Sequence, residues 1–297
     1  VIKKITKNNN GGMEAATYSR RKNIMIVQHN LSASNTNRQL GITTSGLQKS
    51  TEKLSSGYKI NRAADDAAGL SISEKMRNQI RGLNKASDNA QDGVSLVQTA
   101  EGALNEVHSM LQRISELAVQ ASTDTNGSKD RTALADEAKQ LVDEIDRVAT
   151  TTQFNKMNIL DGTFTGKKLQ VGANAGQNIA VSIKSMRASD LGIAKTVAGA
   201  LDSYTNANAA LTAAQAAIET LSTRRSALGA VQNRLEHTIA NLDNISENTQ
   251  SAESRIRDTD MAEEMVSYSK NNILMQAGQS MLAQANQQNQ GVLSLLQ

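Results

Sequence analysis

Residues 72–121 read ISEKMRNQIRGLNKASDNAQDGVSLVQTAEGALNEVHSMLQRISELAVQA, and one spacing runs through the whole stretch. Apolar residues recur alternately every four and three positions, with only Gln79 and Gly93 as exceptions. The apolar members are Ile72, Met76, Leu83, Ala86, Ala90, Val97, Ala100, Leu104, Val107, Leu111, Ile114, Ala118 and Ala121. The spacing predicts a single α-helix of about 75 Å, at about 1.5 Å per residue, that buries one narrow stripe against partner helices.

The composition of the chain favours thin contacts between helices over a thick globular core. Aromatic residues make up only 2% of the 297 residues, and tryptophan is absent. Proline, which would end a long helix, is absent as well. The helix at 72–121 is too long for a compact globule, so it needs long partner helices elsewhere in the chain.

The charge distribution argues against a nucleic-acid binder. The formal net charge is +3, but residues 1–24 carry six basic residues and one acidic residue. Positions 25–297 then hold 26 basic and 28 acidic residues, and the whole chain offers only two Phe and four Tyr for stacking on bases. We therefore expect no nucleic-acid partner.

Catalytic, metal and membrane chemistry are not expected either. The absence of cysteine removes disulfides and thiolate sites. The three histidines, His29, His108 and His237, fall in separate predicted helices without a His-Glu-x-x-His pattern. No stretch approaches 18 consecutive apolar residues. We predict no enzyme, no metal site, no cofactor and no membrane insertion.

Residues 1–24 lack periodicity and are predicted to be a disordered extension upstream of a natural start at Met25. They also lack the apolar core of a secretory signal peptide, so export would need another route. A strict heptad row then begins, beside a row of small polar residues. The apolar row is Ile26, Ala33, Leu40, Leu47 and Leu54. One such row gives an amphipathic helix that is too weak to hold alone.

The C-terminal residues repeat this pattern. Their heptad row is Met261, Met265, Tyr268, Asn272, Met275, Gln279, Leu282, Asn286, Asn289, Leu293 and Leu296. Polar residues within such a row weaken a coiled coil and help to fix its register. We predict that residues 25–65 and 255–297 form one terminal coiled coil.

The intervening residues 66–254 are predicted to form a three-helix rod. A polar cluster at 124–128 ends the first helix, a second amphipathic helix covers 134–148, and a third runs from Tyr204 to about Thr249. A period of two near 168–184 predicts a β-hairpin. The fold class is therefore mainly α, with a terminal coiled coil and a helical rod that carries a small β-hairpin region.

Two groups of carboxylates are open to two interpretations. Asp65 and Asp66 precede the long helix, and Asp260 with Glu263 precedes the last helix. Either group could hold a metal ion, but no third kind of ligand lies nearby, so capping of a helix start is favoured. The glycine-rich loop at 172–176 lacks the strand-to-helix context of a phosphate loop and is interpreted as a connection between strands.

Several long motifs resemble bacterial flagellin. They lie at 54–83, with AADDAAGL at its centre, and at 86–104, 111–120 and 251–296, in the order found in that family. The resemblance implies a secreted structural subunit that self-assembles into the flagellar filament, an extracellular helical homopolymer used for motility. It also implies that the terminal helices form the inner tube and the rod the outer tube, without the large outer variable domains of many flagellins.

The resemblance further implies partners. These are a flagellar secretion chaperone, the filament cap protein, the hook-filament junction proteins and Toll-like receptor 5. The residues that match the receptor site and its subunit-packing face are Gln112, Arg113, Leu117, Gln120 and Glu137. Periodicity places Arg113, Leu117 and Gln120 outside the buried stripe. The residues that resemble the leucines sensed by cytosolic receptors are Val292, Leu293, Leu295 and Leu296.

Two alternative functions stay open at this point. A hook-filament junction protein shares the terminal helices, but the dense central motifs favour flagellin. A non-polymerising helical binding rod would not need terminal heptads too weak to fold alone, whereas a polymer subunit gains from helices that order only when copies stack.

Overall fold

Helices dominate the structure, which confirms the predicted fold class. The computed structural model describes residues 30–194 and 201–294, with the backbone alone for 289–294. The chain divides into two compact units. We call Tyr58–Asp258 the rod unit, and residues 30–57 with 259–294 the terminal unit. The division falls beside Gly57 and Asp258, whereas the sequence placed it at 65 and 255.

Some sequence predictions concern positions outside the described residues or side chains. Outside the described residues lie the extension at 1–24, the start at Met25, Ile26, His29, Leu295 and Leu296. Val292 and Leu293 lie in the last helix, where only the backbone is described.

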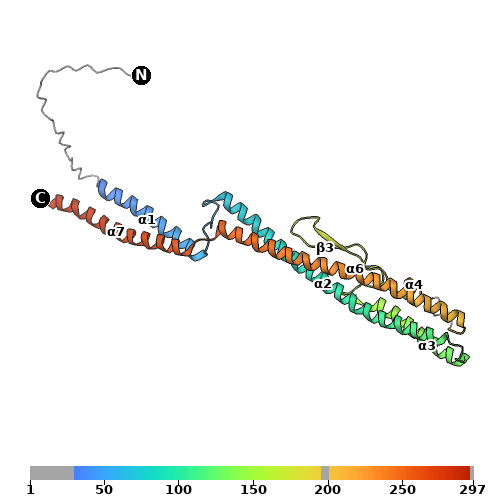
Figure 1. Cartoon of the computed structure of the whole chain (residues 1–297). Coiled ribbons are helices and arrows are strands. Elements are labelled where there is room, and N and C mark those ends of the chain that lie inside the picture. The colour runs from blue at the N-terminus through green and yellow to red at the C-terminus, as the bar shows by residue number, and fades with distance from the viewer. Residues whose placement is uncertain (1–29, 195–200, 295–297) are drawn as a thin grey trace, which may run out of the picture. The chain divides into compact units, whose positions relative to one another are not determined.

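Two long antiparallel helices form most of the rod unit (Figure 1). They are α2 (Ala67–Ala121) and α6 (Tyr204–Arg257), and α3 (Ser128–Thr151) folds back beside the C-terminal half of α2. The predicted three-helix rod is thus present, although α6 continues past Thr249. The pairing is fixed near one end by Ser73 Oγ, which donates to Glu253 Oε1 at 2.8 Å.

The core of the rod unit follows α2 where it lies between α6 and α3. The predicted stripe is completely or almost completely buried at Val97, Ala100, Leu104, Val107, Leu111, Ile114, Ala118 and Ala121. Ala138 and Ile145 of α3, and Ala214 and Leu221 of α6, belong to the same cluster. Small side chains let these helices approach closely, as the scarcity of aromatic residues predicts.

The predicted stripe is wrong at the start of α2. Ile72 is 45% exposed, whereas its neighbour Ser73 is buried. Leu83, Ala86 and Ala90 are buried as predicted, and polar pairs connect the two helices beside them: Ser87 Oγ donates to Asp243 Oδ1 at 3.1 Å, and Ser246 Oγ to Asn84 Oδ1 at 2.7 Å. The apolar spacing predicts a continuous stripe, but only two helices meet here, and side-chain hydrogen bonds set their register.

The predicted β-hairpin is confirmed, and a smaller hairpin precedes it. Strands β3 (Lys167–Gln170) and β4 (Asn178–Val181) pair antiparallel, with Lys167 opposite Val181. The loop at 172–176 connects them. The unpredicted hairpin pairs β1 (Gln153–Phe154) with β2 (Met157–Asn158), through two residues with positive φ. These residues are Asn155 and Lys156, and a lysine gives little signal for such a turn. The short helix α4 (Ala188–Leu191) follows.

The β3–β4 hairpin lies beside the long helices (Figure 1), and it approaches α2 closely at two glycines. A Cβ at Gly93 would lie 2.5 Å from Leu169 Cδ1, and one at Gly82 would lie 2.9 Å from Ala173 Cβ. Both distances are shorter than van der Waals contact, so the absence of side chains at these positions permits the close approach.

The terminal unit is an antiparallel pair of helices, α1 (Leu31–Ser56) and α7 (Met261–Ser294). Asn30 Nδ2 donates to the carbonyl oxygen of Ala285 at 3.0 Å, and Lys53 Nζ lies 3.4 Å from Glu264 Oε2. Gly46 and Gly278 allow close contacts with Asn271 and Leu40. Among its described side chains, Ala285 is the only buried apolar one. The pair therefore has almost no core of its own.

Candidate assembly surfaces

Two of the four carboxylates flagged in the sequence, Asp66 and Asp260, cap helix starts, whereas Asp65 accepts from the backbone N–H groups of Asn61 and Arg62 in the preceding connector. Asp66 accepts from the backbone N–H groups of Ala68 and Gly69 at the start of α2, and Asp260 accepts from Ala262 and Glu263 at the start of α7. Within residues 30–194 and 201–294, no three His, Asp or Glu residues lie close enough to hold a metal ion.

None of the described helices has the length and the apolar character that crossing a membrane requires.

The Arg113 patch, composed of Gln112, Arg113, Glu116, Gln120 and Glu137, joins α2 to α3. Arg113 Nε donates to Glu137 Oε1 at 2.9 Å, and Arg113 Nη1 to Glu116 Oε2 at 3.2 Å. The hydrogen bond to Glu137, followed by that to Glu116, raises the pKa of the Arg113 guanidinium. Gln112 contacts His108 Nε2 at 3.1 Å, and Gln120 is exposed. The fold thus brings four of the five predicted site residues to one exposed surface.

The expectation that Leu117 faces outward is wrong. Leu117 is fully buried in the rod core. The reason is that α3 also packs against this part of α2, so the buried surface is wider than a single coiled-coil stripe. Any effect of Leu117 on binding would therefore act through the fold rather than through direct contact.

Val119 is an exposed apolar residue that the sequence interpretation missed. Its side chain is 54% exposed and lies one helical turn after Glu116, whose side chain is 68% exposed. We call Glu116 and Val119 the α2 ridge. The signal was present in the sequence, because Val119 falls outside the apolar spacing of residues 72–121.

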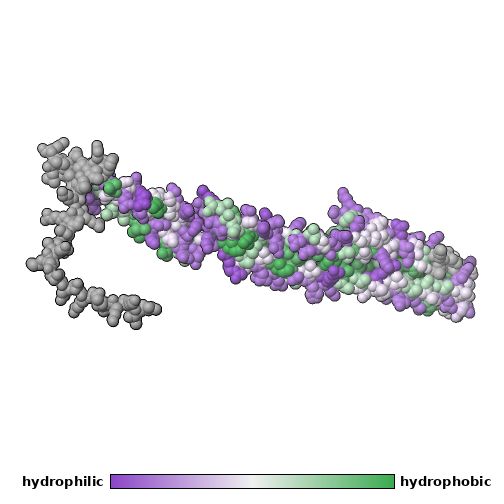
Figure 2. All heavy atoms as spheres, turned by 90° about the horizontal axis from the view of Figure 1, so that it is seen from above, coloured by the Kyte–Doolittle hydropathy of each residue, from purple (hydrophilic) through white to green (hydrophobic). Residues whose placement is uncertain are grey.

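An exposed apolar face covers α7 in the terminal unit. Met265, Val266, Ile273 and Leu274 are between 47% and 69% exposed and line a shallow groove with Ser269 and Lys270. We call Met265, Val266, Ile273 and Leu274 the α7 face. Apolar side chains reach the surface in this unit (Figure 2). The sequence assigned Met265 to the stripe that packs on the N-terminal helix, but Met265 lies on this outer face. Half-buried positions among the predicted stripe residues are Ala33, Leu40, Leu47, Leu54, Met275 and Leu282.

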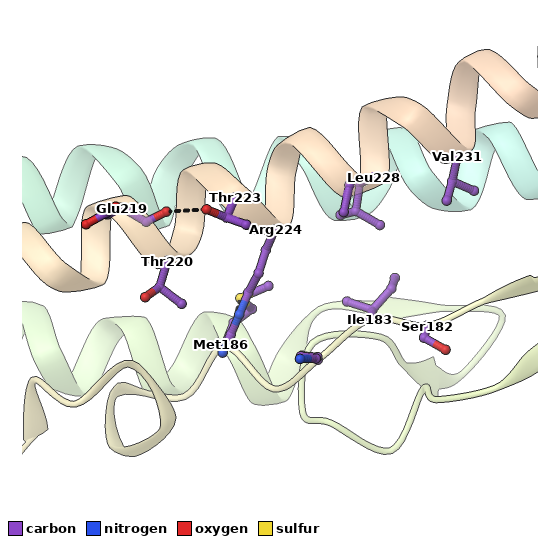
Figure 3. A pocket seen from close by; sticks show the side chains of 11 residues that line it. Ser182, Ile183, Met186, Glu219, Thr220, Thr223, Arg224, Leu228 and Val231 are labelled. Carbon is purple, nitrogen blue, oxygen red and sulfur yellow. Dashed lines mark hydrogen bonds between the residues drawn. The ribbon is translucent and has the colours of Figure 1, made fainter.

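A deeper groove of about 490 Å³ lies in the rod unit between α6 and residues 182–186 (Figure 3). We call it the α6 groove. Its apolar lining comes from Ile183, Met186, Ala227, Leu228 and Val231. Arg224 crosses from α6 toward Met186 and donates to the carbonyl oxygen of Ser185. Burial lowers the pKa of the Arg224 guanidinium. No sequence signal marked this groove, because it depends on the path of an irregular segment.

The fold consists of long paired helices, and the terminal unit exposes an apolar face on α7. The polar side chains described above cap helices or join one helix to another. These features are typical of a structural protein that assembles. Family models agree: the bacterial flagellin N-terminal helical region matches residues 27–165, and the C-terminal helical region matches residues 211–296. The chain belongs to the bacterial flagellin family, whose members are structural subunits of the flagellar filament.

Similar proteins cover nearly all of the chain. Flagellin from Halalkalibacterium halodurans is 58% identical over 92% of this chain and 100% of its own length. Flagellin from Bacillus subtilis strain 168 is 50% identical with the same coverage. A solved chain described as a flagellar hook-associated protein, from Vibrio parahaemolyticus, is 11% identical with a TM-score of 0.57, covering 65% of this chain and 100% of that chain. That likeness concerns the fold alone.

Proposed function

We propose that this chain polymerises through the α7 face and the apolar residues exposed on α1, as the structural subunit of the flagellar filament. The observation that carries the proposal is the terminal unit itself. Its helices leave Leu31, Ile42, Val266 and Ile273 between 57% and 71% exposed, while burying almost no apolar side chain between themselves. Such a pair gains stability chiefly by packing on other copies.

The energetics favour a lattice of copies over a single contact. Fully burying one Val, Leu, Ile or Met side chain contributes about 1.5–3 kcal/mol. Association costs about 4–15 kcal/mol in lost translational and rotational freedom. A subunit that touches one neighbour through part of its face gains too little, whereas a subunit that enters a growing end touches several copies. Growth should therefore need a nucleus.

Polymerisation is tested with seeded protein, by electron microscopy and circular dichroism. We expect the wild type to form filaments and to gain helicity as it assembles. A double variant, Val266→Asp with Ile273→Asp, should stay monomeric because charge on the α7 face opposes its burial. The matched control Val266→Ile with Ile273→Val keeps the α7 face apolar and should still polymerise. Normal filaments from the double variant would reject this role for the α7 face.

The remaining partners and the location follow from family membership as proposals. The chain acts as a non-catalytic, secreted subunit of the extracellular filament. A flagellar secretion chaperone holds it before export, the filament cap protein guides its insertion, and the hook-filament junction proteins anchor the polymer. Pull-down of each partner with the full chain, compared with a chain lacking residues 259–297, tests whether the terminal unit carries these contacts.

Host detection is a second proposal for the Arg113 patch. Toll-like receptor 5 would bind Gln112, Arg113, Gln120 and Glu137, with Leu117 supporting them from the core, and cytosolic receptors would sense Val292, Leu293, Leu295 and Leu296. We expect Arg113→Asp to lower receptor signalling by the monomer, because it places a carboxylate beside Glu116 and Glu137. Unchanged signalling at equal monomer concentration would refute the receptor assignment.

A further inference from the structure

We infer that the α2 ridge of one copy inserts into the α6 groove of a second copy. This inference rests on the proposed function, because it concerns a contact between subunits of one polymer. It assigns a specific pair of surfaces, with an apolar contact at Val119 and a charged contact at Glu116.

The chemistry of the α6 groove fits such an occupant. Ile183 comes from the 182–186 segment and Leu228 and Val231 come from α6 (Figure 3). Lys184 and Arg224, which already donates to the carbonyl oxygen of Ser185, line the groove with the single carboxylate of Glu219. The hydroxyl of Thr223 donates to the backbone oxygen of Glu219, so that hydroxyl is already engaged. The groove therefore favours an apolar side chain with a carboxylate beside it.

The α2 ridge is the surface of the rod unit with that combination. Large exposed apolar residues on its described helices are Ile72, Val119, Tyr204 and Ile245. Of these four, only Val119 has a carboxylate three or four positions away on its helix, at Glu116. Ile72 has Lys75 instead. Glu116 Oε2 accepts from Arg113, but its side chain stays 68% exposed and open to a second cation.

The geometry of the rod unit sets the offset between two such copies. Arg225 Nη2 lies 3.5 Å from Glu101 Oε1, so the α6 groove is level with Glu101 on α2. Val119 lies further along α2 by about 27 Å, at about 1.5 Å per residue. Inserting Val119 of one copy into the groove of another therefore staggers parallel rods by about 27 Å.

This contact is heterologous, because the ridge and the groove are different surfaces. Each copy in a contacting pair keeps one unused ridge or groove, so addition continues at both kinds of end. A staggered contact of this kind generates an open helical polymer instead of a closed dimer. It also gives every subunit the same orientation along the polymer.

Engineered cysteines test the contact, because the natural chain has none. We expect filaments of the double variant Val119→Cys with Ala227→Cys to give a ladder of disulfide-linked multimers on oxidation. Within one copy the two positions are about 27 Å apart along the rod, far beyond disulfide reach of about 4.4–6.8 Å between Cα atoms. The unassembled double variant should therefore stay uncrosslinked.

The matched control moves one cysteine along the same face of α6. Ala216 is exposed, as Ala227 is, and lies about three helical turns from it. Val119→Cys with Ala216→Cys should give no ladder. A ladder from this control, or none from Ala227 in normal filaments, would overturn the inference.

A reconstruction of wild-type filaments by electron cryomicroscopy supplies an independent measurement. Val119 should touch Leu228 of a neighbour whose rod is displaced by about 27 Å, and a different neighbour at Leu228 would overturn the inference. Failure of the wild type to polymerise at all would instead refute the proposed function, so the two failures are distinguishable.

Discussion

Leu117 and Val119 sit two positions apart on α2 and have opposite environments. Leu117 is fully enclosed where α3 covers the helix, whereas Val119 is 54% exposed. Truncating a buried leucine removes its transfer free energy and leaves a cavity, but truncating an exposed valine removes few contacts. A substitution at Leu117 therefore tests the stability of the fold, and a substitution at Val119, within the same helical turn, tests a surface contact.

We predict that Leu117→Ala lowers the free energy of unfolding of the monomer by about 2–5 kcal/mol. Val119→Ala should change it by no more than about 0.5 kcal/mol, as surface substitutions usually do. Chemical denaturation followed by circular dichroism measures both. Equal effects of the two variants would contradict the burial of Leu117.

Asp161 gives a pH-dependent contact near the small hairpin. Its Oδ1 accepts from the hydroxyl of Thr163 at 2.7 Å and from the backbone N–H of Thr163 at 2.9 Å. The hydrogen bond from the Thr163 hydroxyl, and to a smaller extent the one from the Thr163 backbone N–H, hold the pKa of the Asp161 carboxyl below its usual range. Because the folded pKa is depressed, this contact stabilises the fold above the ordinary pKa of aspartate and is lost as the pH falls through the folded value.

Replacing the hydroxyl tests this account. We predict that Thr163→Ala raises the pKa of Asp161 toward its usual value, while Thr165→Ala leaves it unchanged. Titration of the carboxyl carbon by NMR measures the pKa directly. If both variants had the wild-type pKa, the hydroxyl of Thr163 would not be the main cause.

At the scale of elements, the hairpin docks on α2 where α2 lacks side chains. Gly82 and Gly102 lie in the same helix, yet a Cβ at Gly82 would meet Ala173, and a Cβ at Gly102 would meet nothing within 4 Å. We predict that Gly102→Ala stabilises the rod by about 0.5–1 kcal/mol, the usual gain of alanine over glycine in a helix.

Gly82→Ala should lose that gain, because the loop around Ala173 must move away from the new methyl group. Hydrogen exchange by mass spectrometry should show faster exchange at 172–178 in Gly82→Ala and wild-type exchange there in Gly102→Ala. Equal protection of the loop in both variants would contradict the close approach.

The sequence predicted the long helices because their spacing repeats over many turns, so single exceptions hardly matter. It predicted the β3–β4 hairpin from alternation, but not the β1–β2 pair, since Lys156 with positive φ has no compositional signal. The site was predicted in part. Gln112, Arg113, Gln120 and Glu137 lie on one exposed surface, but the ion pair between Arg113 and Glu137 was not predicted. Leu117 is buried by a third helix, and the α6 groove depends on tertiary packing.

At the scale of the whole molecule, the two units differ in how much apolar surface they bury. The rod unit has a large apolar core along α2 from Leu96 to Ala121. The described side chains of the terminal unit include only Ala285 as a buried apolar residue. The terminal unit should therefore unfold first, since its helices rely on few tertiary contacts.

We predict two stages in thermal unfolding of the monomeric full chain, the first being loss of α1 and α7. An excised rod, residues 58–258, should show the upper transition alone, with nearly the same midpoint. Circular dichroism at 222 nm measures both. A single transition in the full chain, absent from the rod, would show instead that the units fold as one.

The chain enters and leaves the rod unit at the same point. Tyr58 pairs with Asp258, the backbone N–H of Lys59 donates to the carbonyl oxygen of Arg257, and the Arg257 guanidinium lies 4.5 Å above the Tyr58 ring. A pulling force applied through the two ends would load this small clamp first. It would then unzip α2 from α6 one turn at a time, without shearing them along their length. Under tension the rod should therefore yield first where the chain enters and leaves it. Its resistance there depends on the contacts that join residues 58–59 to residues 257–258.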